Sequence, residues 1–421
     1  MVFVLNRQKQ PLAMVSNAKA RRLLKQNKAV VHRMVPFVIR LKNNNIVSNQ
    51  AVELRLDPGA KTTGVCIVDS NNSALFFAEI HHRGEAVKKA LDQRRGVRRS
   101  RRQRTTRYRA PRFDNRTRPI GWLAPSVKSR ADNVINWAIK LSQWVNIKSC
   151  VIESVSFDNS SMTEGQKLFA TQYQQGPLYQ TTLRKAVIAK HNGSCAYCGE
   201  KGEEAEHIIS KQKGGSNSFH NLTFSCRACN EKKGTLALKE FGEVMGKDYS
   251  HLEPSKTPKH AAIIQSARNY TIKSIKSFGL NVSTCEGWET RLNREDSELP
   301  KEHYYDAFAT SIIGAIQTND VLIIKAQGRG KRLMTRVDRF GFPRQKAKSQ
   351  KVVHGFQTGD IVKAAVSKGK KAGTHTGRVA VRETGNFNIT TKAGTVQGIS
   401  FKYCNLIQKG DGYGYQTKKT A

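Results

Sequence analysis

Two pairs of cysteines, each pair with two intervening residues, constrain the middle of this chain more than any other feature. Cys195 and Cys198 form the first pair, and Cys226 and Cys229, after a gap of 27 residues, form the second. Four cysteine sulfurs in this spacing can supply a tetrahedral zinc site. Because a module this short has little apolar core, zinc binding would contribute directly to its folding. The spacing therefore predicts structural zinc, and four reduced, unligated cysteines are the alternative.

The whole chain is strongly basic. Its 421 residues include 72 Lys and Arg against 32 Asp and Glu, which gives a formal charge of +40. Such a charge favours a nucleic-acid partner, because each neutralised phosphate releases a counterion. A hydrophobic fraction of 38% supports two to four folded domains and argues against a purely disordered basic tail. No apolar run reaches the ~20 residues of a membrane helix, and the polar start is a poor signal peptide. We expect no membrane partner and a reducing compartment.

Alternating strand-like and helix-like segments predict an α/β core built on a mixed sheet. Three strand-like runs within residues 52–80, separated by turn-forming residues, suggest an antiparallel meander. An amphipathic helix capped by Ser126 follows, and then a buried strand at 150–155. A helix, a strand and a helix are expected at 261–279, 280–287 and 303–316. This order places helices on the faces of a mixed sheet.

The two ends of the chain differ from this core. Residues 1–50 read as a small basic α+β unit, with strand-like VFVL and MVPFVIRL on either side of the helical AKARRLLKQ. After about residue 325 the chain becomes rich in Lys and Gly, and short strand-like runs such as GDIVKAAV and GISFKY recur. That pattern suggests a small β-barrel.

Three acidic residues of the core, with one histidine, are candidate metal ligands. Asp57 ends the first strand of the meander, and Glu153 follows the apolar run 150–152. His303 and Asp306 lie three residues apart, so they share one face of a helix. Carboxylates that converge at one end of a sheet could hold the two Mg²⁺ ions that a phosphodiester-cleaving site uses. Taken singly, each has an ordinary alternative, such as a turn-forming Asp before Pro-Gly or a charge at a strand edge.

The segment between residues 83 and 118 contains thirteen arginines, and its central run RRGVRRSRRQRTTRYR has no acidic residue. A helix with arginine on all sides is too basic for a protein core but suits insertion between nucleic-acid backbones. A solvated, nonspecific basic tail is the alternative. The candidate phosphate-binding residues are Arg94, Arg95, Arg98, Arg99, Arg101, Arg102 and Arg104.

The sequence between and after the cysteine pairs resembles the HNH (ββα-metal) nuclease pattern. Its segments are EHIISKQKGGSNSFHNLTFSC and RACNEKKG. The resemblance makes His207 the general base, Asn221 the residue that holds the loop orienting His207, and Glu206 and Asn230 the oxygen ligands of one Mg²⁺. Glu206 stands where the pattern more often has Asp. His191 and His220 compete with His207 but lack its flanking acid, and a zinc ribbon that only binds DNA is the alternative.

Three further motifs in chain order resemble those of a RuvC-type nuclease core. They are LRLDPGAKTTGV, VIESVSFD and KEHYYDAFAT, and they are split by the arginine-rich segment and the HNH-like module. The whole arrangement resembles IscB, a family of transposon-encoded RNA-guided nucleases related to the type II CRISPR effectors. Pro11-Leu12-Ala13-Met14 also resembles the N-terminal PLMP signature of that family, with Ala13 in place of Met.

The resemblance implies an RNase H-like core in which Asp57, Glu153, His303 and Asp306 form the RuvC metal site with two Mg²⁺ ions. His303 would act on the attacking water. The arginine-rich segment would be a bridge helix that binds the RNA–DNA hybrid. The implied partners are a guide RNA of the omega RNA type and double-stranded DNA with a short motif beside the target. The family further implies a monomeric ribonucleoprotein in the prokaryotic cytoplasm, associated with the nucleoid.

The domain organisation implied by these motifs has seven parts. They are an N-terminal unit (1–50), RuvC part I (51–82), the bridge helix and connector (83–125), RuvC part II (126–165), the HNH module (178–248) and RuvC part III (258–325). The seventh part is a C-terminal domain (326–421) that contacts RNA and the target-adjacent motif. An RNA-guided endonuclease that cuts both DNA strands is the leading interpretation. A protein-only, structure- or site-specific DNA endonuclease and a catalytically idle nucleic-acid-binding protein are the alternatives.

Overall fold

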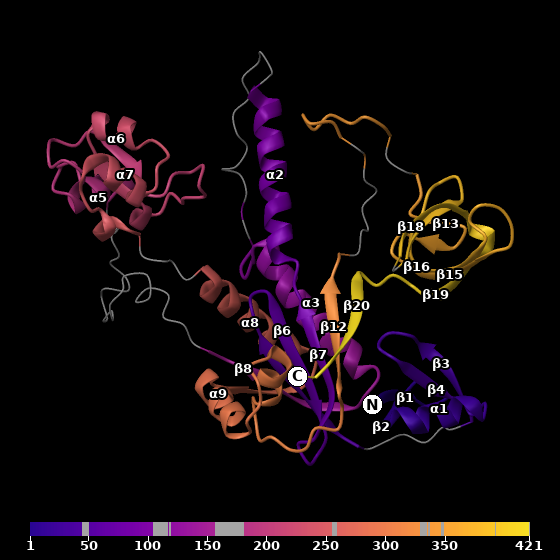
Figure 1. Ribbon diagram of the computed structural model, residues 1–421. Helices are drawn as coiled ribbons and strands as arrows, with labels where there is room; N and C mark the ends of the chain where they lie inside the picture. Colours follow the sequence, from indigo (N-terminus) through magenta and orange to yellow (C-terminus); the bar gives the residue numbers. More distant parts are fainter. Residues whose placement is uncertain are drawn as a thin grey trace. The chain divides into compact units, whose positions relative to one another are not determined.

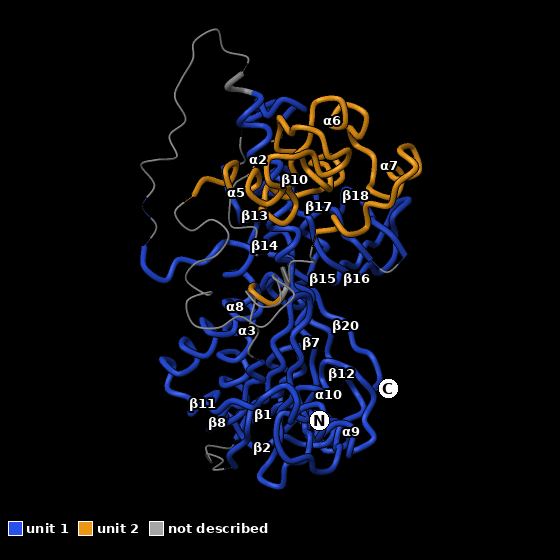
Figure 2. Tube along the Cα trace, turned by 90° about the vertical axis from the view of Figure 1, so that its left-hand side faces the viewer, with its two compact units in different colours: residues 1–156, 263–421 blue, residues 157–262 orange. Residues whose placement is uncertain are grey.

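The structure is a computed structural model that describes residues 1–43, 50–103, 117, 119–155, 181–254, 259–328, 335, 337–346, 349–391 and 393–420, without the side chains of 101–103 and 259–260. The chain divides into two compact units (Figure 2). The first comprises Met1–Ser156 and Ile263–Ala421, and the second comprises Phe157–Ala262. The second unit is thus an insertion in the first, and it contains both cysteine pairs.

A seven-stranded mixed sheet organises the first unit, in the order β11-β8-β5-β6-β7-β12-β20 (Figure 1). The strands are β5 (Val52–Pro58), β6 (Thr62–Val68), β7 (Ala74–His81), β8 (Ile147–Glu153), β11 (Asn281–Cys285), β12 (Asp320–Ala326) and β20 (Tyr413–Lys419). β5, β6 and β7 form the antiparallel meander that the turn residues predicted. β8 pairs parallel to β5, β11 parallel to β8, and β12 parallel to β7, while β20 is antiparallel to β12. The expected mixed α/β class is confirmed.

Helices cover both faces of this sheet. On one face, Trp137 and Leu141 of α3 (Pro125–Ser142) and Ile275 of α8 (Lys259–Ser277) pack against the apolar side chains of the central strands. On the other face, α10 (His303–Phe308) packs through its aromatic residues, and Phe308 contacts Phe77 of β7. A further helix, α9 (Gly287–Asp296), follows β11.

Two helix boundaries differ from the sequence prediction. α3 begins at Pro125, and its N-cap is Ala124 instead of Ser126, because proline suits the first helical position. α10 ends at Phe308 and does not continue to residue 316. The buried guanidinium of Arg55 accounts for this early end, because it donates to the carbonyls of Phe308 and Ile312, at 2.9 and 2.8 Å. Those carbonyls therefore turn toward Arg55.

The N-terminal part is an α+β unit that contains two strands more than the sequence suggested. Its sheet has the order β2-β1-β4-β3. The elements are β1 (Val2–Leu5), β2 (Pro11–Val15), α1 (Asn17–Lys25), β3 (Ala29–Arg33) and β4 (Val38–Leu41). Phe3 on one face of β1 contacts Phe76 and Trp144 of the central core, while Val2 and Val4 on the other face pack with α1.

The C-terminal part forms a five-stranded antiparallel sheet with its own apolar core around Phe387 and Ile389. Its strands are β15 (Ile361–Val366), β16 (Gly373–Ala380), β17 (Asn386–Thr391), β18 (Gly394–Ser400) and β19 (Cys404–Gln408), preceded by the short pair β13 (Val352–Val353) and β14 (Phe356–Gln357). The order β18-β17-β16-β15-β19 leaves β18 and β19 as edges within the described residues, so the expected closed barrel is an open sheet there.

The inserted unit is small, and its core is largely aromatic. Phe241 stacks on Tyr249, and Tyr197 packs edge-on against both rings, beside the buried Cys195 and Cys229. The elements are α5 (Leu183–Lys190), β9 (Glu204–His207), the 3₁₀ turn η2 (Phe219–Asn221), β10 (Leu222–Ser225), α6 (Arg227–Lys233), α7 (Leu238–Met245) and the 3₁₀ turn η3 (Ser250–Leu252). β9 and β10 pair antiparallel, and α6 follows directly, which is a ββα arrangement.

Candidate metal centres and nucleic-acid interface

The first candidate centre lies where β5 and β8 end. These strands are parallel neighbours with Leu56 opposite Ile152, so Asp57 and Glu153 reach the same edge of the sheet. α10 brings two further side chains to this edge. It approaches β6 so closely at Gly64 that a Cβ there would lie 1.7 Å from the carbonyl oxygen of His303. Glycine at this position therefore allows the first turn of α10 to lie directly on the strand.

The four predicted residues of this centre lie together. Possible ligand atoms of Asp57, His303 and Asp306 all lie within 4.8 Å of one another. His303 Nδ1 is 3.0 Å from Asp57 Oδ2, and Asp306 forms an ion pair with Arg294 at 3.0 Å. Glu153 adjoins the group, because its carboxyl interacts with both Asp57 and Asp306. The donor set of three carboxylates and one imidazole suits hard divalent cations such as Mg²⁺.

The electrostatics of the first centre also favour a bound cation. Burial, followed by the hydrogen bond and charge of Asp57, raises the pKa of Glu153 to about 9. Burial and the charge of Asp57 also raise the pKa of Asp306, although Arg294 opposes this. The pKa of His303 is raised chiefly by its hydrogen bond with Asp57. These carboxylates disfavour one another's ionised forms, and a divalent cation between them would remove that penalty.

A supporting residue that the sequence analysis missed is Arg268 of α8. Its side chain is buried, donates to the carbonyl of Val155, and lowers the pKa of Glu153 through its positive charge. It therefore steadies the chain just after β8. The sequence could have indicated Arg268, because a basic residue on the buried side of an amphipathic helix needs a polar partner.

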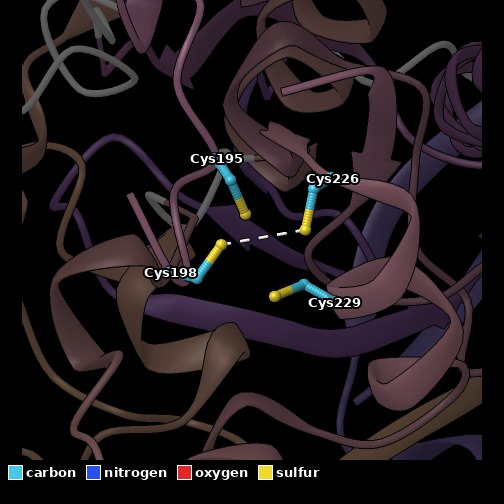
Figure 3. A group of neighbouring side chains, drawn as sticks. All are labelled: Cys195, Cys198, Cys226 and Cys229. Atoms are coloured by element: carbon cyan, nitrogen blue, oxygen red, sulfur yellow. Dashed lines mark hydrogen bonds between the residues drawn. The ribbon is translucent and has the colours of Figure 1, made fainter. Parts of the chain in front are cut away.

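The second candidate centre is the group of four cysteines. Figure 3 shows that their side chains point toward a common centre, and their sulfurs lie within 4.8 Å of one another. Cys198 Sγ and Cys226 Sγ are 3.7 Å apart. A tetrahedral site with Zn–S bonds of ~2.3 Å has sulfurs about 3.8 Å apart. The cysteine group therefore fits a structural zinc in both donor type and spacing.

The ββα segment places His207 and Asn221 as neighbours in the inserted unit. Asn221 closes the loop that follows His207, because its Oδ1 accepts from the backbone N–H of Ile209 at 3.0 Å and its Nδ2 donates to Ser216 O at 2.8 Å. His207 is partly exposed, and its Nε2 lies 2.8 Å from Asn217 Oδ1. In contrast, the competing His191 is hydrogen-bonded to Thr223 Oγ1 at 3.0 Å. The geometry favours His207 as the reactive imidazole.

The two predicted metal ligands of this segment have different partners. Glu206 is buried, and its Oε1 lies 2.7 Å from Nζ of Lys233, which is itself fully buried. Lys233 also donates to the carbonyl of His207 at 2.9 Å. Asn230 instead donates to Glu204 Oε2 at 2.6 Å. The sequence analysis did not select Glu204 or Lys233.

The arginine-rich segment forms the long helix α2 (Gly84–Gln103). Arg94, Arg95, Arg98 and Arg99 are exposed on it, and the first and third also bond back to backbone carbonyls one turn earlier. Arg101 and Arg102 lie in the same helix, but their side chains are outside the described residues, and Arg104 lies outside them altogether. The described part of the segment is therefore a helix with its cationic groups at the surface.

Two protein families match separate parts of the chain. The family described as RRXRR protein matches residues 2–176, and the family described as HNH endonuclease matches residues 195–236. The first match includes Arg98-Arg99-Ser100-Arg101-Arg102, which has the spacing that the family's name spells out. The second coincides with the cysteine group and the ββα segment. The chain thus carries an HNH endonuclease domain, which makes it a nuclease and hence a hydrolase.

Comparison with solved structures finds distant similarity to Cas9 proteins. Streptococcus thermophilus Cas9 in complex with the AGAA PAM is 13% identical, with a TM-score of 0.31, over 61% of this chain and 32% of that one. The Type II-C Cas9 enzyme from Actinomyces naeslundii is 14% identical, with a TM-score of 0.17, over 45% of this chain and 32% of that one. The matched region thus spans about a third of each Cas9 chain. No curated protein matches the chain.

None of the helices in the described parts of the chain is both long enough and apolar enough to span a membrane.

Proposed function

We propose that this protein is an RNA-guided DNA endonuclease of the IscB type, which cuts the guide-paired strand with its HNH domain and the displaced strand with a RuvC-type site in an RNase H-like core. The observation that carries the proposal is the presence of two separate candidate hydrolytic centres in one chain. One is the group around Asp57 in the central sheet. The other is the ββα segment around His207 in the inserted unit.

At the RuvC-type centre, Asp57, Glu153 and Asp306 would hold Mg²⁺. When bound, two such ions stabilise the attacking and leaving oxygens of a phosphodiester. His303, held by Asp57 at 3.0 Å, would position and deprotonate the attacking water. Arg294 beside Asp306 would fix the orientation of that carboxylate.

At the HNH centre, His207 would take the proton of the attacking water. Asn217 supplies the hydrogen bond that orients the imidazole, and Asn221 holds the intervening loop in place. Asn230 of α6 and a carboxylate of β9 would hold one Mg²⁺, which stabilises charge on the phosphate oxygens. The cysteine-bound zinc would be structural, because all four of its positions are filled by the protein.

RNA guidance is supported by the basic helix α2 and by the overall charge of +40. Exposed arginines on a helix can bridge the phosphates of a guide RNA and of its hybrid with DNA, while base pairing supplies the sequence specificity. We further propose an omega-type RNA, a short DNA motif read beside the target, and a monomeric ribonucleoprotein located in the prokaryotic cytoplasm.

Strand-specific cleavage tests the two-centre proposal. RNA that copurifies with the protein is sequenced, and duplex DNA carrying its complement is then cut in Mg²⁺ with the two strands labelled separately. H207A should cut only the displaced strand, and D57A should cut only the guide-paired strand. H191A is the matched control and should cut both.

Two outcomes would contradict the proposal. Loss of both cuts in either single variant would exclude two independent centres. Cleavage that needs no RNA would exclude guidance and would favour a protein-only, structure- or site-specific endonuclease.

A further inference from the structure

A large cavity beside α3 and α8 is separate from both candidate centres. Its volume is about 930 Å³, and all of its lining residues belong to the first unit. Its walls come from the start of α2, the N-terminal half of α3, the connector between these two helices, and α8. Residues just after β12 and at the start of β20 complete it.

The cavity and the metal centre around Asp57 lie on opposite faces of the central sheet. Leu56 of β5 packs in the core beneath α3, and side chains alternate along a strand. The side chain of Asp57 therefore points to the other face, where α10 supplies His303. A DNA strand held at that centre would lie on the α10 side, so the cavity suits a different ligand.

Polar side chains at helical spacing form the α3 wall of the cavity. Ser129, Asn133 and Asn136 lie on one side of the helix, next to its buried apolar side. Asn133 is held in place, because its Oδ1 accepts from the hydroxyl of Tyr413 at 3.2 Å and its Nδ2 lies 3.4 Å from His82 Nδ1. Amide and hydroxyl groups arranged in this way can donate to and accept from the edge of a nucleobase.

Aromatic and apolar side chains also line the cavity and remain exposed. In the connector, Trp122 is 43% exposed and Ile120 is fully exposed. Tyr270 of α8 adds a second aromatic ring. Unpaired bases are typically bound in this way, with the base plane stacked on an aromatic ring and the base edge hydrogen-bonded to polar groups.

The charges around the cavity suit a phosphate group. The two acidic residues that line it already have cationic partners. Asp132 lies 2.7 Å from Lys128, and Asp411 lies 2.8 Å from Lys140. Arg83, just before α2, also lines the cavity and donates to a backbone carbonyl just after β12 at 2.9 Å. Because a guanidinium carries five N–H donors, Arg83 can make this bond and still bind a phosphate.

The cavity lies at the base of the basic helix α2. Val87 of α2 lines it, and Arg94 and Arg98 are exposed further along the same helix. At ~1.5 Å per residue, Val87 and Arg98 are about 16 Å apart along the helix axis, which is the length of roughly five stacked nucleotides at ~3.4 Å each. An RNA strand bound along α2 could therefore reach the cavity.

We propose that this cavity captures an unpaired nucleotide of the guide RNA, with its base against Trp122 and its phosphate at Arg83. The α3 amides would hydrogen-bond the edge of the base. Because a base held here cannot also pair with DNA, it belongs to a part of the RNA outside the segment that pairs with the target. This inference rests on the RNA partner proposed above, and it adds a base-specific contact to the phosphate contacts of α2.

Chemical probing of the copurified RNA, bound to the full chain, tests the site. One unpaired base should be protected in the wild type and become reactive in W122A, whereas W122F should keep the protection because it keeps an aromatic ring. W288A is the matched control, since Trp288 of α9 is 66% exposed and does not line the cavity. It should leave the protection unchanged.

Binding measurements on the same variants give a second readout. W122A should weaken binding of that RNA by roughly 5- to 150-fold, the range expected for the loss of one base–aromatic stack. Its zinc content and melting temperature should match those of the wild type. R83Q should reduce the salt slope of RNA binding by about 0.7, as expected for one lost phosphate contact, and R83K should retain the slope.

The possible outcomes separate this inference from the proposed function. Unchanged protection and affinity in W122A, in a protein whose cleavage is guided by its RNA, would overturn the inference and leave the function standing. If W122A lost protection and affinity as expected but the RNA directed no cleavage by the wild type, the cavity assignment would stand and RNA guidance would fail. An equal loss of affinity for single-stranded DNA, or an equal loss of RNA affinity in W288A, would overturn the assignment of the cavity to RNA.

Discussion

The carboxylates that lie close together at the ends of β5 and β8 lower the stability of the fold when no metal is bound. Glu153 lies against Asp57 at a buried edge of the sheet, and its pKa is raised from 4.5 to about 9. Its folded state therefore holds a proton more tightly than the unfolded state does. Between these two pKa values the contribution of this group to stability falls as the pH rises. Sites arranged for chemistry commonly carry such a cost.

Replacing this glutamate should stabilise the metal-free protein. In EDTA at pH 8, E153Q should melt above the wild type, since about 1 kcal/mol corresponds to roughly 2–4 °C in a domain of about 150–250 residues and to somewhat less in a larger one. The difference should shrink as the pH falls toward 5 and should also shrink when Mg²⁺ is added. Differential scanning calorimetry measures it, with the exposed α7 variant E243Q as the control. A lower melting temperature for E153Q at pH 8 in EDTA would refute this reading of the site.

At the residue scale, the structure brings together the residues predicted for the first centre, whereas the two metal ligands predicted for the second centre have different partners. Asp57 lies in β5, Glu153 in β8, and both His303 and Asp306 in α10; the strand order alone brings the first two to one edge. In the ββα segment, the motif named Glu206 but could not show that Lys233 would occupy it. The sequence spacing is nevertheless consistent with these contacts: residues two apart in β9 meet residues three apart in α6, so Glu204 contacts Asn230 and Glu206 contacts Lys233.

Among the elements, α2 shows most directly how a basic sequence gives a positively charged surface. Arg94, Arg95, Arg98 and Arg99 are exposed at its C-terminal half, while Lys88 and Lys89 are exposed near its start. The helix therefore offers one pair of adjacent lysines and two pairs of adjacent arginines, which differ in position but not in charge. A nonspecific basic element would treat the pairs alike, whereas a bridge helix would depend on the arginines, which can bind phosphates through two parallel hydrogen bonds.

Replacing the arginine pair Arg98 and Arg99 should therefore affect RNA binding differently from replacing the lysine pair Lys88 and Lys89. R98Q/R99Q should weaken guide RNA affinity and guided cleavage much more than K88Q/K89Q does. The affinity for plain duplex DNA should change little, and by the same amount in the two variants. The salt slope for RNA should fall by roughly 0.7–0.9 for each phosphate that the variant no longer neutralises. Filter binding across a salt series measures both. Equal reductions in RNA affinity for the two double variants would indicate a nonspecific basic helix.

The elements that the sequence mispredicted were changed by tertiary contacts. Periodicity suggested a helix to residue 316, but α10 ends at Phe308, whose carbonyl accepts a hydrogen bond from the buried Arg55. Strand-like runs after residue 325 suggested a small β-barrel, but the pairing of distant strands is not encoded in such local runs. The meander of β5 to β7 was predictable because its turns are short and locally specified.

For the whole molecule, Asp411 connects three parts of the first unit. Its carboxylate lies 2.7 Å from Arg33 of the N-terminal sheet and 2.8 Å from Lys140 of α3, and it also accepts from Tyr415 of β20. Burial opposes its ionisation, but the hydrogen bonds from Lys140 and Tyr415 and the nearby charges outweigh burial and lower the pKa of Asp411. This group therefore stabilises the fold above its unfolded pKa, and that contribution is lost as the pH falls through the folded pKa.

Removing this carboxylate should loosen the junction. At pH 7, D411N should lose roughly 3 kcal/mol of stability, because two cations are left without their shared partner. The difference from the wild type should narrow below about pH 4, near the normal pKa of aspartate. Urea unfolding at several pH values measures it, with D320N as the control because the Asp320–Lys419 pair is exposed. A loss of stability that does not depend on pH would show that the charge of Asp411 is not what matters.

The pairing of β12 with β20 has a consequence for how the molecule could be rebuilt. Ala326 and Tyr413 are direct partners in that antiparallel ladder, so everything between them leaves and rejoins the central sheet at one point. In topological terms, the C-terminal sheet is the enlarged loop of a β-hairpin. Loop closure costs rise only slowly with length, and such junctions tolerate exchange. The β12–β20 hairpin is therefore a natural splice point, at which this sheet could be exchanged for another folded domain, provided that Asp411 is kept.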